Sequence, residues 1–272
     1  DFTDEVPIID PKLPENKEKR YQYAQKFWDS RKRKGSKLLD AQKLMRERNY
    51  FAAMMVNESD ADGLITGYSR NYATVVKPML ELIGMARGVS RIAATNLMLT
   101  KRGPIFLADT TININPTSKE LVKISQLTGG LVKMFGMKPN IAMLSFSNFG
   151  SSESEDANKV RDAISNIHKN YPNVVIDGDL QADFALNPEM LKGEFPFSKL
   201  VNKKVNVLLF PNLHSANISY KMMKELYGAE SIGPIMMGMK KPAHILQLGA
   251  SVDEIVNMTA VAVIDAQNKS KK

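Results

Sequence analysis

Short apolar runs bounded by turn residues alternate along this chain with longer segments of helical periodicity. This alternation is typical of an α/β protein with a largely parallel sheet. Segment 186–204, which contains Pro188, Gly193 and Pro196, interrupts the pattern and is predicted to be a long loop. The predicted buried strands lie at 52–56, 105–108, 141–146, 174–176 and 205–210, and the predicted helices at 37–48, 72–83, 118–135, 154–169, 217–226 and 251–266.

The composition excludes several classes of protein. A length of 272 residues allows one large or two ordinary domains. The chain has no cysteine, which excludes a disulfide framework, a thiolate zinc site, an iron–sulfur cluster and a cysteine nucleophile. No apolar run approaches the roughly 18 residues of a membrane-spanning helix. We therefore predict a protein that does not bind membranes, and the lack of cysteine suits a cytoplasmic location.

The positive charge is concentrated near the amino-terminal end. The net charge is +8, and residues 12–48 hold 13 Lys and Arg against 5 Asp and Glu, which accounts for all of it. The densest run is Arg31-Lys32-Arg33-Lys34-Gly35, after a segment in which Tyr23, Phe27 and Trp28 have helical spacing. Such a run is either a solvated helix end or a docking patch for phosphates. Without a zinc-finger or RNP-like motif, and with 7% aromatic residues, the chain favours a phosphate-bearing small molecule over nucleic acid.

Ligands of open α/β sheets bind beyond the carboxyl ends of the strands, so the polar loops 57–67, 109–116, 147–152, 177–183 and 211–217 are candidate ligand loops. The turn Ser147-Asn148-Phe149-Gly150-Ser151-Ser152 joins a predicted strand to a predicted helix. Its backbone N–H groups are suited to hold an anion, and an ordinary serine N-cap explains the same residues. Neither a Gly-x-Gly-x-x-Gly fingerprint nor a P-loop is present.

Two groups of carboxylates could bind a divalent cation through oxygen, or could cap turns. Asp60 and Asp62 precede Gly63, and Asp177, Asp179 and Asp183 form the second group. We favour turn capping, because aspartate beside glycine is common in turns. The three histidines form no His-Glu-x-x-His pattern, and no Gly-x-Ser-x-Gly motif occurs.

Several runs in the second half of the chain resemble the phosphate acetyltransferase and butyryltransferase family. They are Ala142-Met143-Leu144-Ser145-Phe146-Ser147, Asp177-Gly178-Asp179-Leu180-Gln181-Ala182-Asp183, Asn206-Val207-Leu208-Leu209-Phe210-Pro211-Asn212-Leu213 and Ile232-Gly233-Pro234-Ile235. Other runs are more similar to the phosphotransacetylase-like C-terminal domain of bifunctional NADP-dependent malic enzymes: Leu107-Ala108-Asp109-Thr110-Thr111-Ile112-Asn113, Ser147-Asn148-Phe149-Gly150-Ser151 and Phe195-Pro196-Phe197-Ser198. The similar runs keep their order from about Ile8 to Gln267.

The resemblance implies a two-domain fold of the isocitrate dehydrogenase type, with mainly parallel sheets and a cleft between the domains. Residues 1–115 and 234–272 would form the first α/β domain, and residues 116–233 the second. Because the family domain usually begins with further βα units, the resemblance also implies that the first domain is truncated at its amino-terminal side. Active members transfer an acetyl group between coenzyme A and phosphate in the cleft.

The catalytic stretch of the family is altered in this sequence. Active members carry Asn-Asp-Leu-Ser-Arg-Gly after Pro-Val, whereas here Pro242-Ala243 is followed by His244-Ile245-Leu246-Gln247-Leu248-Gly249. The resemblance therefore places Gln247 at the serine position, Leu248 at the arginine position and Glu254 at the position of the aspartate base. Leucine cannot bind phosphate or stabilise an oxyanion. Ser251-Val252-Asp253-Glu254 also reads as a helix capping box, which we favour over a base.

Two arginines of active members match Arg31 and Lys77, which together with Ser147, Asn148 and Ser151 are the expected ligand-binding residues. Lysine keeps the charge at position 77 but lacks the planar fork of arginine. We therefore expect a regulatory domain of a malic enzyme that binds acetyl-CoA or CoA with weak or absent acyl transfer; an active phosphate acetyltransferase is the alternative, with acetyl phosphate or phosphate as further ligands. The resemblance implies at least a homodimer. It assigns NADP and a divalent metal to a malic enzyme catalytic domain outside this chain, and no cofactor to this domain.

Overall fold

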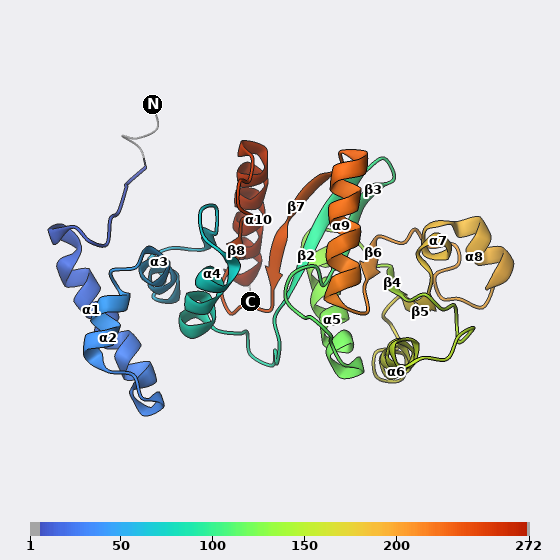
Figure 1. Cartoon of the computed structure of the whole chain (residues 1–272), viewed down its shortest axis with the longest axis horizontal. Coiled ribbons are helices and arrows are strands. Elements are labelled where there is room, and N and C mark those ends of the chain that lie inside the picture. Colours follow the sequence, from blue (N-terminus) through green and yellow to red (C-terminus); the bar gives the residue numbers. More distant parts are fainter. Residues whose placement is uncertain (1–5, 271–272) are drawn as a thin grey trace.

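The computed structural model describes residues 6–270, and its central feature is a six-stranded sheet (Figure 1). The strand order is β5-β4-β6-β3-β2-β7. Strands β3, β4, β5 and β6 run parallel to one another, whereas β2 is antiparallel to both of its neighbours. The predicted α/β class with a mainly parallel sheet is thereby confirmed. The strands are β2 (Ala93–Thr100), β3 (Gly103–Ala108), β4 (Ile141–Leu144), β5 (Ile176–Leu180), β6 (Val207–Leu209) and β7 (Glu230–Met237).

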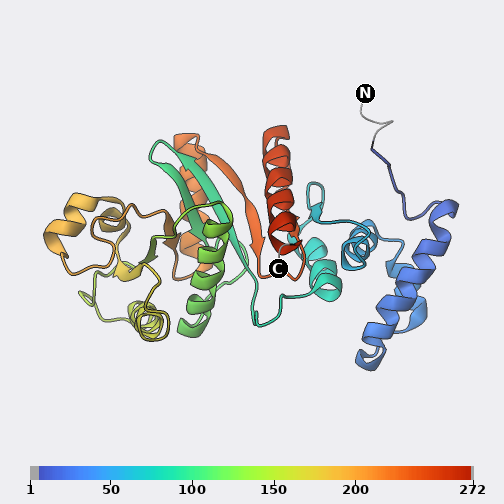
Figure 2. The same ribbon diagram turned by 180° about the vertical axis from the view of Figure 1, so that it is seen from behind.

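Helices cover both faces of this sheet, because successive side chains of a strand point to opposite sides. Phe106 and Ala108 of β3 share a core with α5 (Ser118–Met134), α6 (Glu155–Asn170) and α10 (Val252–Ser270). Ile105 and Leu107 of the same strand pack in a second core with α7 (Ala182–Leu186), α8 (Pro188–Glu194) and α9 (Leu213–Tyr227). Helix α9 lies in front of the sheet in Figure 1, and α5 lies in front of it in Figure 2.

A second, two-stranded parallel sheet joins β1 (Leu64–Thr66) to β8 (Ala243–Ile245). Helix α3 (Arg48–Asn57), helix α4 (Tyr72–Pro78) and the π-helical turn η3 (Met79–Ile83) pack against it. Because β1 and β8 are far apart in the sequence, their pairing brings α10, which follows β8, close to β1. The two-domain division predicted from the resemblance would place strands of the six-stranded sheet in both domains, and it stays a prediction.

The basic segment forms a helical layer at one end of the molecule. It consists of η1 (Pro14–Asn16), α1 (Lys17–Arg31), η2 (Lys32–Lys34) and α2 (Leu38–Leu44). Aromatic rings attach this layer to α3, since Tyr23 and Phe51 have ring centroids 5.1 Å apart. In both views α1 and α2 lie at one end and α7 and α8 at the other (Figures 1 and 2). The predicted closing of a helix by the basic run is confirmed.

Local signals explain the helices that were predicted well. Thr117 and Glu120 form a reciprocal capping box at the start of α5, and Ser154 caps α6 by accepting the N–H of Ala157. Asn212 caps α9 in the same way by accepting the N–H of Ser215. No helix within residues 6–270 has the length and apolar character needed to cross a membrane.

Several of the predicted elements are wrong wholly or in part, among them the loops 57–67 and 211–217, which contain β1 and the start of α9. The apolar run 52–56 lies inside helix α3, because a run of five apolar residues fits a buried helix as well as a strand. Segment 186–204 contains α8, which begins where Asn187 accepts the N–H groups of Glu189 and Met190. Strand β5 runs to Leu180, so Asp177 and Asp179 belong to a strand and not to a loop.

Candidate functional site

The parallel strands end at one edge of the six-stranded sheet, and the predicted ligand loops 109–116, 147–152 and 211–217 follow β3, β4 and β6 at that edge. A hollow of about 370 Å³ opens there. Its lining includes Ser145 and Phe146, which directly follow β4, Asn212 and Ser215 at the start of α9, and Asp156 of α6. Of the three loops, only 211–217 lines this hollow, and the Leu213 N–H donates to the carbonyl of Ile114 at 3.0 Å, which joins the loops after β6 and β3.

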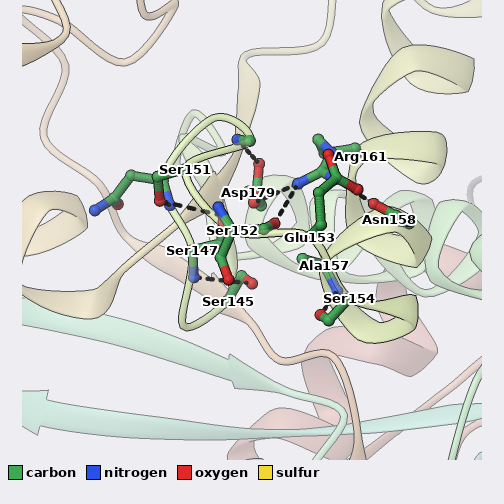
Figure 3. A network of polar contacts seen from close by, with 12 residues as sticks. Ser145, Ser147, Ser151, Ser152, Glu153, Ser154, Ala157, Asn158, Arg161 and Asp179 are labelled. Carbon is green, nitrogen blue, oxygen red and sulfur yellow. Dashed lines mark hydrogen bonds and ion pairs between the residues drawn. The ribbon is translucent and has the colours of Figure 1, made fainter.

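The serine turn after β4 is closed by its own side chains (Figure 3). Ser147 Oγ accepts the N–H of Ser152 at 3.2 Å, and Ser151 Oγ accepts the N–H of Asn148 at 3.0 Å. Asn148 Oδ1 accepts the N–H of Gln181 at 2.8 Å, which joins this turn to the end of β5. These contacts use the groups that an anion would need. A ligand role for Ser147, Asn148 and Ser151 stays a prediction.

The aspartates of the second carboxylate group take part in the structure of the chain. Asp179 accepts the N–H of Gly150 at 3.2 Å and lies 3.3 Å from Arg161, as Figure 3 shows. Asp177 accepts the hydroxyl of Ser198 at 2.9 Å. Within the described range 6–270, no group of three or more His, Asp or Glu side chains has the arrangement of a metal site.

The first carboxylate group lies beside the basic layer. Asp60 forms an ion pair with Lys19 at 2.7 Å and accepts a short hydrogen bond from the hydroxyl of Tyr23. Hydrogen bonds from Lys19 and Tyr23 hold the pKa of Asp60 below its usual value. Asp60 therefore joins the end of α3 to α1.

Asp109, directly after β3, organises the loop that borders the same edge. Its carboxylate accepts the N–H groups of Ala94, Thr111, Ile112 and Asn113 at 2.9 to 3.2 Å. Burial raises the pKa of Asp109, although these N–H groups act in the opposite direction. Sequence reasoning named this loop but missed Asp109 as its anchor; the signal was a lone acidic residue at the end of a buried strand.

The altered catalytic stretch follows β8 and leads into α10. Gln247 donates from Nε2 to the hydroxyl of Tyr220 at 2.6 Å. The Leu248 side chain is 67% exposed. Glu254 Oε2 accepts the N–H of Ser251 at 2.8 Å, and Ser251 Oγ accepts the N–H of Glu254 at 3.2 Å. The capping box anticipated for Ser251 and Glu254 is present at the start of α10.

Glu254 also makes an ion pair that the sequence did not indicate. Lys224 Nζ of α9 lies 2.8 Å from Glu254 Oε1. Burial alone would raise the pKa of Glu254, but the hydrogen bonds from Lys224 and Ser251 lower it overall. The hydrogen bond to Glu254 in turn raises the pKa of Lys224. A base role for Glu254 stays a prediction, and so do the functional roles assigned to Gln247 and Leu248.

The expected phosphate-binding residues lie elsewhere in the molecule. Arg31 Nη2 at the end of α1 is 3.3 Å from Glu81 Oε1 in η3. Lys77 is exposed and lies four residues before Glu81 in the same helical segment. A hollow of about 270 Å³ opens beside Arg31 and Lys34. Helices α1 and α10 lie apart in both views (Figures 1 and 2). Arg31 pairs with Glu81, whereas Glu254 contacts Lys224 and Ser251.

His244, in the middle of β8, is a core residue. Its Nδ1 accepts the N–H of Met236 at 3.3 Å, and its Nε2 lies 3.4 Å from Asp265 Oδ2 of α10. The side chain is 1% exposed. The His244 side chain thus joins β7, β8 and α10.

Comparison with known proteins places this chain in a family. The sequence pattern of the phosphate acetyl/butaryl transferases matches residues 3–263, so the chain belongs to this family. It is 35% identical over 261 residues to a phosphate acetyltransferase of Clostridium acetobutylicum, a match that covers 93% of this chain and 78% of the relative. The solved EutD phosphotransacetylase from Staphylococcus aureus superimposes with a TM-score of 0.85 at 31% identity, over 98% of this chain and 80% of that one.

A second kind of relative carries this family domain as a part. The chain is 36% identical over 264 residues to an NADP-dependent malic enzyme of Haemophilus influenzae. That match covers 96% of this chain but 35% of the relative. The chain thus spans about a third of the length of this relative. The resemblance to the phosphotransacetylase family, and to the related part of malic enzymes, is confirmed.

Proposed function

We propose that this chain is a phosphotransacetylase-like regulatory module that binds acetyl-CoA and transfers the acetyl group weakly or not at all. The observation that carries the proposal is the state of the altered stretch. On the pattern of the family, Gln247 and Leu248 stand where active members have serine and arginine. Leu248 offers no donor to a phosphate or an oxyanion, and loss of one such donor typically lowers a rate by about 10²–10³.

The basic layer supports retained binding of the phosphates of coenzyme A. Residues 12–48 hold the whole excess of positive charge, and Arg31 and Lys34 border a hollow at the end of α1. A cationic surface attracts polyanionic ligands without any need for catalytic residues. Retained binding together with impaired chemistry is what a sensor requires.

The partner in this proposal is a malic enzyme catalytic domain, supported by the malic enzyme relatives. Acetyl-CoA bound to this module would change the activity of that domain, and the coupling between the two sites must be reciprocal. NADP and a divalent metal would belong to the catalytic domain. The cysteine-free composition suits the reducing cytoplasm, where we expect the assembly to work.

The competing proposal is a working phosphate acetyltransferase, supported by the acetyltransferase relatives and by a carboxylate retained at position 254. In that case Glu254 takes the thiol proton while Arg31 and Lys77 bind phosphate. The separation of α1 from the start of α10 within one chain weighs against it.

Calorimetric titration with acetyl-CoA and with CoA, run beside an assay of acetyl-CoA formation from acetyl phosphate, tests the proposal. We expect binding with negligible turnover. Changing Arg33 and Lys34 to Glu should weaken binding several-fold, whereas Lys169→Glu on α6 is the matched control at a distance from the basic layer. Turnover at the level of active relatives would establish the competing proposal, and absence of binding would refute both.

We also propose that the module forms a homodimer through α9. Ile218, Met222 and Leu226 project from one face of this helix and are 57%, 53% and 68% exposed. Their spacing of four residues makes one apolar stripe, and Lys221 and Glu225 beside it would pair with their counterparts in an antiparallel copy. Light scattering should give twice the chain mass of 30.3 kDa. Met222→Glu should yield monomers; a wild-type monomer would contradict the proposal.

A further inference from the structure

Two polar side chains of α9 contact the altered catalytic stretch. The hydroxyl of Tyr220 accepts a hydrogen bond from Gln247, and Lys224 forms an ion pair with Glu254. Residues 220 and 224 are four apart, so they project from the same face of the helix. One face of α9 therefore contacts both Gln247 and Glu254, the residues that the family pattern matches to the serine and to the base.

The contacts occupy the groups that the transfer reaction would use. Lys224 Nζ donates to Oε1 of Glu254 and the Ser251 N–H donates to Oε2, so each carboxylate oxygen already has a donor. The amide of Gln247 is bonded to Tyr220, which is 3% exposed and fixed in the core. Residues of α9, outside the altered stretch, therefore help to orient the side chains of Gln247 and Glu254.

We propose that Tyr220 and Lys224 are positioning residues that hold Gln247 and Glu254 in an arrangement unable to support acyl transfer. The inference rests on the proposed function, because it takes the role of position 254 from the family. In the transfer, a carboxylate at 254 takes the proton of the CoA thiol, and the thiolate sulfur bonds to the acetyl carbon of acetyl phosphate. The carbon–oxygen bond to phosphate then breaks, and phosphate leaves with the electron pair.

Lys224 opposes the first of these steps in two ways. It holds the carboxylate oxygen that would have to face the thiol. It also stabilises the charged carboxylate, which makes Glu254 a weaker base for a thiol whose pKa is about 8.5. Without this cation, proton transfer to Glu254 becomes more favourable.

An ordinary structural ion pair would behave differently. The Lys224 and Glu254 side chains are 37% and 29% exposed, and ion pairs that water reaches contribute little to stability. If the pair only joined α9 to α10, its loss would lower the stability slightly and leave the rate of transfer unchanged. Kinetics therefore separates the two roles.

The test compares wild type with Lys224→Gln, Lys224→Arg and Tyr220→Phe in the acetyl phosphate assay. Lys224→Gln should raise kcat about threefold or more, with little change in KM, because the pKa of the Glu254 carboxylate rises when the cation is removed. The rising limb of the pH–rate profile should move to higher pH. Lys224→Arg should restore the wild-type rate and profile, and Lys192→Gln, an exposed helical lysine of α8, is the control.

Titration with acetyl-CoA on the same samples keeps the two proposals distinguishable. If wild type binds acetyl-CoA and Lys224→Gln leaves both kcat and the pH profile unchanged, the positioning role is refuted while the proposed function stands. A fall in kcat would also refute it, because Lys224 would then assist the reaction. If wild type fails to bind and Lys224→Gln gains turnover, the positioning role is supported and the sensor function is refuted. If no sample binds or turns over, both are refuted.

Discussion

The buried carboxylate of Asp109 gives the sharpest test of how this fold is held together. All of its recorded partners are donors: the N–H groups of Ala94, Thr111, Ile112 and Asn113, and the side-chain amide of Asn113. Asp109→Asn keeps the size of the side chain but replaces one acceptor oxygen with an NH₂ group. With the remaining oxygen toward Ala94, Thr111 and Ile112, the new NH₂ faces the two donors of Asn113.

The magnitude follows from those two donors. Each buried donor left without an acceptor costs about 1–3 kcal/mol, so the free energy of unfolding should fall by about 2–6 kcal/mol. Asn113 cannot relieve this by turning its amide, because Nδ2 also donates to the carbonyl of Ile92 at 3.1 Å and Oδ1 accepts from Arg91 at 2.9 Å. Turning would break both of these bonds.

Urea unfolding followed by circular dichroism measures the loss. The control is Asp156→Asn on α6, whose side chain is 60% exposed and forms an ion pair with Lys159 at 3.0 Å. This change should alter the free energy of unfolding by no more than about 0.5 kcal/mol. A loss below about 1 kcal/mol for Asp109→Asn, with an unchanged m-value, would refute the assignment of Asp109 as the anchor of this loop.

Three further changes test other parts of the structure. Gly67 has φ +112°, and a Cβ there would lie 2.6 Å from the carbonyl oxygen of Leu246, so Gly67→Ala should lower the free energy of unfolding by more than about 2 kcal/mol in thermal unfolding. Gly193→Ala in α8, where a Cβ meets nothing within 4 Å, is the control and should not have this effect. Equal effects of the two substitutions would contradict the reasoning. Burial opposes ionisation of Asp265, but the nearby His244 and the charge of Lys269 lower its pKa from 3.8. Its contribution to stability is therefore complete above that pH and is lost as the pH falls through the lower folded value. Asp265→Asn should therefore flatten the acid side of a urea-midpoint profile, and an unchanged slope would exclude this role. Gln247→Ser combined with Leu248→Arg should raise acetyl transfer by about tenfold or more, since it returns two donors to the family's catalytic positions, and no increase in a folded variant would show that the stretch was assigned wrongly.

The elements that sequence reasoning predicted well are those with strong local signals. Helix α6 has a serine cap and an apolar stripe, and β3 is a short apolar run between turn residues. Strand β2 was missed because Thr95 and Asn96 interrupt its apolar pattern. Both side chains are buried and form hydrogen bonds with residues of β7: Thr95 with Met237 and Asn96 with Ser231. A polar residue inside a strand is acceptable only when a distant strand satisfies it, and no local pattern shows that.

The candidate site divides in the same way. The capping box of Ser251 and Glu254 could be recognised from the residues alone, whereas the matching of Gln247, Leu248 and Glu254 to catalytic positions came from the resemblance to the family. The partners of the stretch could not be recognised, because Tyr220 is 27 residues from Gln247 and Lys224 is 30 residues from Glu254. Nothing in the composition of α9 singles out these two residues from its other polar side chains.

The sequence by itself determined the α/β class, most of the helices and the concentration of positive charge in residues 12–48. The resemblance to the family added the expectation that Gln247 and Leu248 replace a serine and an arginine. Periodicity, caps and charge are properties of neighbouring residues, so they can be read along the chain. The tertiary structure alone decided that α9 contacts the altered stretch, that Asp109 anchors its loop, and that Arg31 pairs with Glu81. Those outcomes depend on atoms meeting within about 3 Å across the packed fold, and such contacts are set by the packing of whole elements rather than by local sequence.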